Sequence, residues 1–321
     1  MPNKAFLIAL GLVAPLTLAA PASAQDTLKM VMGQINNWEN QSPVLGQDAG
    51  LYKKHNVVVE MTGSQGAGET IQAVISGSAD LGGGVGVAGA MRAMEKGAPI
   101  RILLPMFTGT TDLYWYVKAD SPLKSLKDTT EQNTIAYSTN GSSSNNIVIA
   151  FREELGAKAK PTPTGGPPGT MTAVMSGQVD IGWAAPPFGL KEIKEGTLRI
   201  IARGSDVPSL RGQTVRVVIV NENSLKTKRA AIMRFVDAYR EGVDWLYKDP
   251  KAMEAYAAKM KIPVEIVKQS AADFQPFSAM QTDEMKDLDG TIRDAVKLKF
   301  LEKSLTKEQI AEFIQIPPRK K

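Results

Sequence analysis

The sequence lacks cysteine altogether and contains a single histidine, His55. Without cysteine the chain forms no disulfide framework, and it offers no attachment point for the lipid anchor of a bacterial lipoprotein. The scarcity of cysteine and histidine also argues against zinc sites and against the usual nucleophile–base pairs. Because carboxylates are not clustered either, we expect no metal site, no cofactor and no enzymatic activity. His55 lies in the charged turn 53–56, where we expect it to be solvated.

Neither sign of charge dominates the sequence, which has 38 lysines and arginines against 33 aspartates and glutamates. These charges are evenly spread, apart from the terminal Arg319-Lys320-Lys321, which we interpret as a frayed tail. A nucleic-acid-binding domain carries a concentrated basic surface, and this pattern does not predict one. The mild positive balance can assist the approach of a negatively charged ligand.

Long apolar runs are missing except within the first 24 residues. There, Lys4 precedes the apolar stretch Ala5–Ala20, and Ala22-Ser23-Ala24 forms a small-residue cleavage site. This order is typical of a secretory signal peptide, which is too short and wrongly flanked for a membrane-spanning helix. A buried N-terminal helix is the weaker interpretation, because Pro15 and Pro21 would interrupt it. We therefore predict a signal peptide over residues 1–24 and a mature periplasmic protein without a lipid anchor.

One stretch occurs twice, one hundred residues apart. Gly66–Gly82 and Gly166–Gly182 are identical at eight of seventeen positions. Each copy reads as a glycine-containing loop, a helix that a Ser-Gly pair can end, and a short strand that begins near Asp80 or Asp180. Two such units predict two similar lobes that face each other and can hold a ligand between them. We interpret the two aspartates as structural, because the repeat explains their equivalence without any chemistry.

The residues around the first copy alternate between strand and helix patterns. We expect strands over 28–33, 57–61 and 101–107 and helices over 43–52 and 86–95. β-Branched residues are concentrated in the predicted strands, and a proline stands in the first turn of the helix over 43–52. This order predicts a layered α/β lobe.

The middle of the chain forms a second lobe in this interpretation. Extended segments over 112–119 and 215–221 bracket it, and we predict that they are the two crossings, or hinge strands, between the lobes. The first lobe then comprises residues 25–118 and 219–321, and the second lobe comprises 119–218. Five helices over 226–247, 250–260, 263–274, 281–297 and 306–313 are expected to pack on the first lobe.

Ligands of open α/β sheets bind beyond the carboxyl ends of the strands. The loops expected there are 36–38, 63–66, 82–85 and 138–145. The last one, Ser-Thr-Asn-Gly-Ser-Ser-Ser-Asn, precedes a helix, whose free N–H groups and hydroxyls can receive an anion or a carbonyl. An ordinary serine N-cap is the alternative, but one serine would suffice for it.

Two tryptophans follow or lie within these loops. Trp183 can offer a flat face to a ligand, or it can be buried in the core. Trp38 is the stronger candidate, because it lies in a polar loop where no packing role is evident. No arginine is clearly placed to pair with a charged ligand group.

The order of several short motifs resembles the periplasmic solute-binding proteins of ABC importers for nitrate, sulfonates, taurine and compounds like the thiamine precursor. The matching segments are Gln47–Tyr52, Lys54–Val59, Ser76–Asp80, Gly141–Ser144 and Ser176–Asp180. The resemblance covers most of the mature chain. It implies the type II periplasmic binding fold, with two α/β lobes, two hinge strands and a cleft that closes on its ligand.

The resemblance also implies that Trp38, Gln65, the Gly83-Gly84 loop and Ser142-Ser143 line the cleft. Two departures lie near the expected ligand: the turn after Trp183 is shifted, and Asn146 replaces a common aromatic residue. The ligand is therefore not copied from any one family member. The full set of ligand-binding residues that we predict is Asn37, Trp38, Gln65, Gly83, Gly84, Thr110, Ser138, Gly141, Ser142, Ser143 and Trp183.

These expectations favour a receptor that captures a small organic anion, either a sulfonate or a carboxylate, and presents it to an ABC permease in the inner membrane. We expect a monomer with a small-molecule ligand and no nucleic-acid partner. The alternatives are an enzyme like those of thiamine-pyrimidine synthesis, which the single histidine disfavours, and the ligand-binding component of a sensor system.

Overall fold

The repeated stretch folds into the same unit twice. In the computed structural model, which describes residues 25–319, the first copy forms helix α3 (Ala67–Ile75) and strand β3 (Leu81–Gly86). The second copy forms helix α6 (Pro167–Met175) and strand β8 (Gly182–Ala184). Each helix ends at the predicted Ser-Gly pair. The glycine has a φ of 74° in the first copy and 78° in the second, a left-handed conformation that glycine adopts readily because it has no β-carbon. The predicted signal peptide lies outside the described residues.

The two aspartates of the repeat make equivalent hydrogen bonds. Asp80 Oδ2 accepts the Lys29 N–H at 2.9 Å, and Asp180 Oδ2 accepts the Thr134 N–H at 2.8 Å. The donors lie at or near the start of β1 (Asp26–Gly33) and of the strand that begins at Thr134, so each aspartate ties the repeat to another strand of its own lobe. The prediction that the pair is structural is confirmed. Asp80 also accepts hydrogen bonds from Ser224 and Lys228.

The first lobe contains a five-stranded sheet with the order β2-β1-β3-β10-β4. The first three strands in this order run parallel, and β10 is antiparallel to both of its neighbours. All eight residues of β10 are buried, as the apolar run Val217–Val220 leads one to expect of a central strand. The bounds are β1 (Asp26–Gly33), β2 (Val57–Ser64), β4 (Ile100–Thr108) and β10 (Thr214–Asn221).

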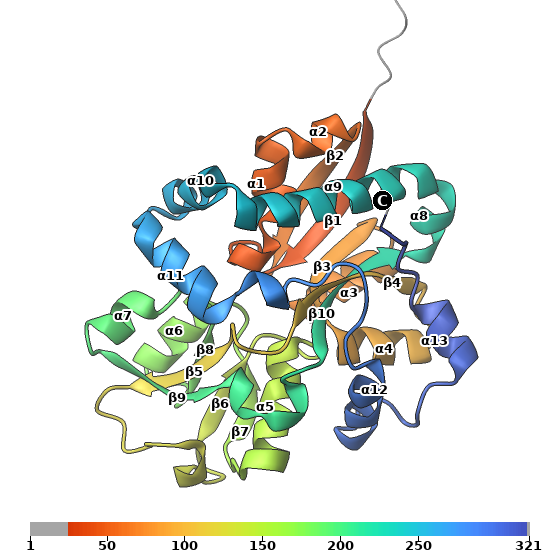
Figure 1. The fold of residues 1–321 in the computed structure, drawn as a ribbon. Coiled ribbons are helices and arrows are strands. Elements are labelled where there is room, and N and C mark those ends of the chain that lie inside the picture. Colours follow the sequence, from red (N-terminus) through yellow and green to blue (C-terminus); the bar gives the residue numbers. More distant parts are fainter. Residues whose placement is uncertain (1–24, 320–321) are drawn as a thin grey trace, which may run out of the picture.

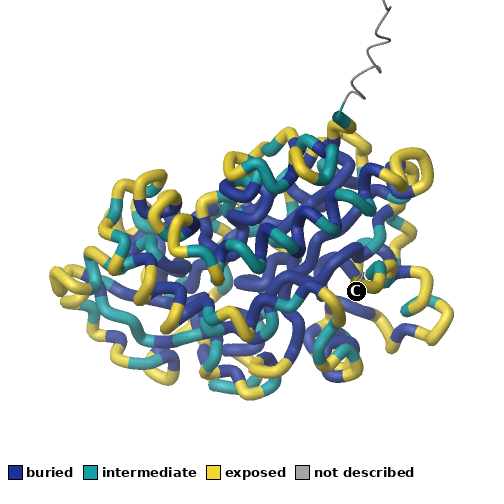
Figure 2. Tube along the Cα trace, turned by 45° about the horizontal axis from the view of Figure 1, so that its top comes forward, coloured by how far each residue is buried: buried dark blue, intermediate teal, exposed yellow. Residues whose placement is uncertain are grey.

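Helices cover both faces of this sheet (Figure 1). The long helix α9 (Arg229–Lys248) lies over one face together with α1 (Ser42–Asp48) and α2 (Leu51–Lys54), while α3 and α4 (Val87–Glu95) lie over the other. Figure 2 shows the buried part of the chain running through the sheets, with exposed residues on the outer helices and turns.

The second lobe has two smaller sheets. The strands β8-β5-β9 form an antiparallel sheet, and β6 and β7 form a parallel pair that a bridge between Ile135 and Ile181 joins to it. Trp115 packs at right angles against Phe151, with ring centroids 4.8 Å apart, and anchors this core. The bounds are β5 (Tyr114–Lys118), β6 (Thr134–Tyr137), β7 (Lys160–Pro163), β9 (Leu198–Arg203), α5 (Ser143–Leu155) and α7 (Leu190–Lys194).

The chain passes between the lobes just before β5 and just before β10. Within residues 25–319, strand β5 pairs only with β8 and β9, and β10 pairs only with β3 and β4. The strands predicted as crossings therefore each belong to one sheet, and the passages are residues 109–113 and 204–213. The sheets thus shift both predicted lobe boundaries toward the N-terminus, because strand character alone does not reveal which sheet a strand joins.

The C-terminal helices pack mainly on the first lobe. They are α8 (Glu222–Thr227), α10 (Pro250–Met260), α11 (Val264–Phe274), α12 (Leu288–Lys297) and α13 (Lys307–Phe313). Helix α12 is shorter than predicted, because Asp287 adopts a φ of 46° and caps the helix by accepting the Gly290 N–H. Phe274, at the end of α11, reaches the second lobe and stacks near Tyr114 at 5.9 Å.

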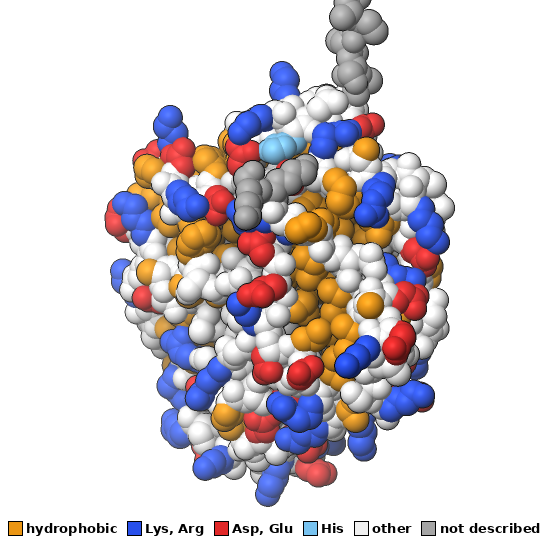
Figure 3. All heavy atoms as spheres, turned by 45° about the vertical axis from the view of Figure 1, so that its right-hand side comes forward, with side chains coloured by type: hydrophobic (Ala, Val, Ile, Leu, Met, Phe, Trp, Pro, Cys, Tyr) orange, Lys and Arg blue, Asp and Glu red, His pale blue; other side chains and the backbone are white. Residues whose placement is uncertain are grey.

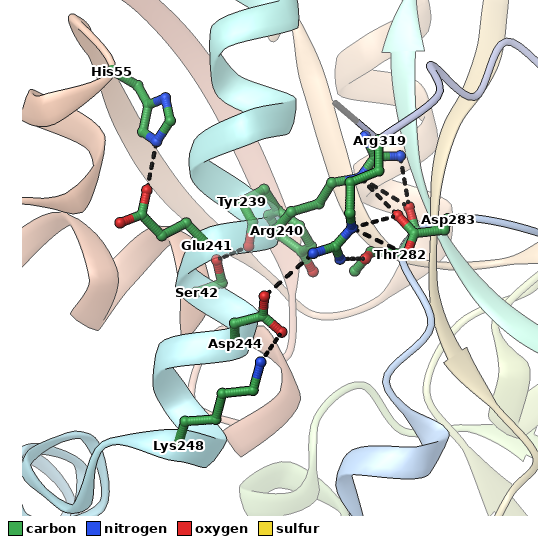
Figure 4. Close-up of polar contacts among 10 residues, drawn as sticks. All are labelled: Ser42, His55, Tyr239, Arg240, Glu241, Asp244, Lys248, Thr282, Asp283 and Arg319. Atoms are coloured by element: carbon green, nitrogen blue, oxygen red, sulfur yellow. Dashed lines mark hydrogen bonds and ion pairs between the residues drawn. The ribbon is translucent and has the colours of Figure 1, made fainter. Parts of the chain in front are cut away.

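Polar contacts fasten α9 to distant parts of the chain (Figure 4). The buried Arg240 donates to the carbonyl oxygens of Thr282 and Pro317, and Arg319 pairs with Asp283. Arg319, the first residue of the predicted frayed tail, is held against α9 by its ion pair with Asp244, while Lys320 and Lys321 lie outside the described residues. His55 is not merely solvated, since its Nε2 lies 2.7 Å from Glu241 of α9.

The surface carries both signs of charge. On the face shown in Figure 3, lysine and arginine side chains alternate with aspartate and glutamate side chains around a central strip of hydrophobic ones. Within the described residues, no helix is long and apolar enough to cross a membrane.

Candidate ligand-binding site

A small cavity lies between the two lobes. Its volume is about 30 Å³, and a cavity needs about 10–15 Å³ on this measure to hold one water molecule. Its polar side chains come from both lobes and from strand β10. They are Gln34, Asn37, Glu39 and Asn40 of the first lobe, Ser138, Ser142, Ser143, Ser144 and Trp183 of the second lobe, and Arg216 of β10.

The wall from the first lobe is built by the short helix η1 (Trp38–Asn40) and the residues before it. Asn40 Nδ2 donates to the carbonyl oxygens of Gly33 and Gln34, both at 3.0 Å, which pins the turn after β1. Asn37 Nδ2 donates to Glu39 Oε1 at 3.2 Å. The amide oxygens of Asn37 and Asn40 are buried and have no hydrogen-bond partner in the part of the chain that the structure describes.

The buried carboxylate of Glu39 is held from two sides. Besides the bond from Asn37, Glu39 Oε2 accepts a hydrogen bond of 2.8 Å from Gln275 Nε2, in the segment after α11. Only 1% of Glu39 is exposed, so this contact brings the C-terminal region to the edge of the cavity. A polar group at this depth needs such partners, because burying it without hydrogen bonds costs free energy.

The wall from the second lobe is the serine loop at the start of α5. Ser142 caps the helix by accepting the Asn145 N–H at 3.0 Å. The Ser144 hydroxyl accepts the Ser138 N–H and lies 3.0 and 3.1 Å from the hydroxyls of Ser142 and Ser138. The cap that we weighed as an alternative is therefore present, and the other serines face the cavity.

Arg216 stands between the two walls. Its Nη2 donates to Asp112 Oδ2 at 2.5 Å and lies 4.0 Å from Glu39 Oε1, and its Nη1 donates to Ser143 Oγ at 3.2 Å. The guanidinium also lies 4.6 Å from the centre of the Phe107 ring. The expectation that no arginine is placed at the site is wrong.

The charge on Asp112 is sensitive to its surroundings. Burial raises the pKa of Asp112 from its ordinary value to about 7, although Arg216 opposes the shift, and the neighbouring Glu39 adds to it. Two carboxyl groups therefore share one guanidinium at the cavity, and Asp112 holds its proton more tightly than an exposed aspartate does.

The lobes touch at several places around the cavity. Gly68 N–H donates to Thr139 Oγ1 at 3.0 Å, and Gly166 N–H donates to Gln65 Oε1 at 3.2 Å. Behind the cavity, Gly89 of α4 faces Gly141 so closely that a β-carbon on Gly89 would lie 2.2 Å from the Gly141 carbonyl oxygen. Close backbone contact of this kind requires glycine.

Six of the predicted ligand-binding residues line the cavity, namely Asn37, Gly84, Ser138, Ser142, Ser143 and Trp183. The other five lie elsewhere. Gln65 is exposed and links the lobes, Gly83 packs against Met32, and Gly141 contacts Gly89.

Trp38 and Thr110 are the remaining two. Trp38 is 2% exposed and packs edge-on against Tyr256 and Tyr247 at 5.2 and 5.7 Å, so the packing role that the sequence did not reveal is supplied by the C-terminal helices. Thr110 is buried in the first crossing, against Gly204 of the second.

The structure adds residues that sequence reasoning missed, chiefly Glu39, Asn40 and Arg216. A signal existed for Arg216, because it is the one charged residue in the otherwise apolar strand pattern Val215–Val220. Glu39 and Asn40 directly follow the predicted ligand-binding loop 36–38, but the prediction selected Asn37 and Trp38 there.

Comparison with known families and structures agrees with this architecture. The model of the NMT1/THI5-like family matches residues 40–253, and no curated protein sequence gives a significant match. The alkanesulfonate-binding protein SsuA from Xanthomonas axonopodis pv. citri, solved bound to MOPS, superposes with a TM-score of 0.74 at 16% identity, over 92% of this chain and 100% of that one.

Two further solved structures share the fold. The periplasmic aliphatic sulphonate-binding protein SsuA from Escherichia coli gives a TM-score of 0.66 at 18% identity, over 92% of this chain and 94% of that one. The periplasmic nitrate-binding protein NrtA from Synechocystis PCC 6803 gives 0.65 at 14% identity, over 89% and 84%. At these identities the likeness establishes the two-lobed fold of ABC-importer substrate-binding proteins.

Proposed function

Because the chain belongs to the NMT1/THI5-like family, we propose that it is the periplasmic receptor of an ABC importer and captures a small organic anion, a sulfonate or a carboxylate, between its lobes. The observation that carries this proposal is the cavity itself, where Arg216 and the N-terminus of α5 converge. Helix N-termini and guanidinium groups are the groups that proteins use to hold sulfonates and carboxylates.

The ligand acts on the arrangement of the lobes in this proposal. A cavity of about 30 Å³ has room for about two or three water molecules, which is less than an organic anion needs, so binding in this proposal involves separation of the lobes and their closure on the ligand. The passages 109–113 and 204–213 are the segments that such a motion bends. A ligand shifts this equilibrium by contacting both walls of the closed form better than the open one.

The cellular setting follows from the predicted signal peptide over residues 1–24. Export places the mature receptor in the periplasm, where the closed lobes present their surfaces to the permease in the inner membrane. In this role the chain acts as a monomer and releases its ligand unchanged.

Calorimetric titration and thermal shift with a panel of short sulfonates and carboxylates test the proposal. We expect saturable binding of at least one member, an upward shift of the melting temperature, and recovery of the same molecule by mass spectrometry. Chemical conversion of the bound compound would instead identify an enzyme.

Two variants test whether the anion binds at this cavity. The double substitution Arg216→Met with Asp112→Asn removes the guanidinium without leaving its carboxylate partner charged, and it should abolish binding. Arg101→Met is the control, because Arg101 pairs with Glu222 and Glu312 at the outer end of β4. Equal affinity in both variants would contradict the assignment of the site.

A further inference from the structure

The two walls of the cavity have opposite hydrogen-bonding character. From this, we propose that the ligand is an amino-bearing anion, whose N–H group binds Asn37 and Asn40 while its sulfonate or carboxylate faces the serine loop and Trp183. This inference rests on the proposed function and specifies its ligand class. It distinguishes amino-bearing anions from bare ones such as simple alkanesulfonates.

The part of the first-lobe wall formed by Asn37 and η1 accepts hydrogen bonds, whereas Arg216 of β10 donates to Asp112 and Ser143. Asn40 Nδ2 donates to two backbone carbonyl oxygens, and Asn37 Nδ2 donates to the Glu39 carboxylate. Since these partners only accept, the orientation of both amides is fixed, and their oxygens must be the atoms left over. Both oxygens are buried without a donor, and both residues line the cavity.

The second-lobe wall donates hydrogen bonds. The hydroxyls of Ser138, Ser142 and Ser144 carry three protons, and only two contacts join them to one another, so one proton is left to donate. Ser143 Oγ already accepts from Arg216, which leaves its own proton free. The Trp183 indole N–H is buried, lines the cavity and has no acceptor.

The charges at the cavity also favour a ligand with an amino group. Glu39 and Asp112 lie beside a single guanidinium, that of Arg216. A bare anion would add negative charge to this set and would leave the two amide oxygens without donors. Burying an unpaired polar group opposes binding, whereas an amino group supplies the missing donors and offsets the excess of carboxylates.

Matched pairs of ligands test this inference on the unmodified protein. The pairs are 2-aminoethanesulfonate with ethanesulfonate, 3-aminopropanoate with propanoate, and 4-(aminomethyl)benzoate with 4-methylbenzoate. Calorimetry should show that the amino-bearing member of the preferred pair binds at least about tenfold tighter than its partner. Tighter or equal binding of the bare anion would overturn the inference and leave the proposed function standing.

Failure of every member to bind would count against the proposed function and, with it, this inference. Asn37→Leu removes one acceptor and should reduce the ratio of affinities within the pair toward one. Trp183→Phe removes a donor from the opposite wall and should weaken both members alike, leaving the ratio unchanged. A ratio that falls with Trp183→Phe but not with Asn37→Leu would reverse the assigned polarity of the walls and contradict the inference.

Discussion

Gly89 and Gly141 meet backbone to backbone across the two lobes, and a β-carbon on Gly89 would lie 2.2 Å from the Gly141 carbonyl oxygen. No side-chain adjustment can relieve that overlap. Gly89→Ala should therefore hold the lobes apart, although alanine favours the helix α4 itself.

The expected result for Gly89→Ala is a larger radius of gyration in solution scattering and a loss of ligand affinity of about tenfold or more. Gly46→Ala in helix α1 is the matched control, because it is also a helical glycine and a β-carbon there would come no closer than 3.5 Å to any neighbour. Unchanged affinity in Gly89→Ala would mean that this contact is not part of the ligand-binding form.

Asp112 should make the free energy of unfolding depend on pH between about 4 and 7. Its pKa is raised from 3.8 to about 7 by burial, against the influence of Arg216. The folded state therefore holds this proton more tightly than the unfolded chain does, so the contribution of Asp112 to stability is complete below about pH 4 and is lost as pH rises through about 7.

Urea unfolding at pH 5 and pH 8 measures this effect. Asp112→Asn, which cannot ionise, should lose less stability between these two pH values than the unmodified protein. Asp180→Asn is the control and should follow the unmodified protein. Parallel pH dependence of the Asp112→Asn variant and the unmodified protein would show that Asp112 does not titrate in this range.

The equivalent aspartates of the repeat should differ in their importance for stability. Asp80 is buried and accepts hydrogen bonds from Lys29 N–H, Ser224 and Lys228, whereas Asp180 is exposed and contacts Thr134 alone. Although burial opposes it, these donors keep the pKa of Asp80 below its ordinary value.

Asp80→Asn should lower the free energy of unfolding by about 2–3 kcal/mol, since it weakens several charge-assisted hydrogen bonds. Asp180→Asn should lower it by less than about 1 kcal/mol. Chemical denaturation with parallel circular dichroism distinguishes them, and equal losses would contradict the structural difference between the two copies.

The two tryptophans should separate binding from stability. Trp183→Phe keeps an aromatic ring and removes the unpaired N–H, so it should weaken ligand binding about five- to tenfold. Trp38→Phe should leave affinity unchanged and lower the free energy of unfolding by about 1–3 kcal/mol, because Trp38 packs on Tyr247 and Tyr256. If Trp38→Phe weakened ligand binding and Trp183→Phe did not, Trp38 and not Trp183 would belong to the ligand-binding site.

The sequence is sufficient to predict the fold because its signals are local. The repeat, the apolar strand patterns and the serine cap of α5 each lie within a short segment. The predicted lobe boundaries differ from the observed passages because strand pairing depends on partners far along the chain. Trp115, for example, pairs with Ala202 and Trp183.

The site is less predictable for the same reason. The serine loop and Asn37 are visible as polar loops after strands, but the ion pair of Arg216 joins residues 104 positions apart, and the Glu39–Gln275 hydrogen bond spans 236. The packing that removes Trp38 from the site comes from helices α9 and α10, which no motif near Trp38 indicates.

Strands β4 and β10 are hydrogen-bonded neighbours, and this has a consequence for engineering. The chain leaves the first lobe after β4 and returns at β10, its neighbour in the sheet. The two ends of the segment 109–213 therefore lie side by side. The second lobe is thus an insertion that could be exchanged as a cassette with that of a relative. Such a chimera would import a new serine loop and tryptophan while keeping Asn37, Glu39 and Arg216, and would thereby separate the contribution of each wall to ligand choice.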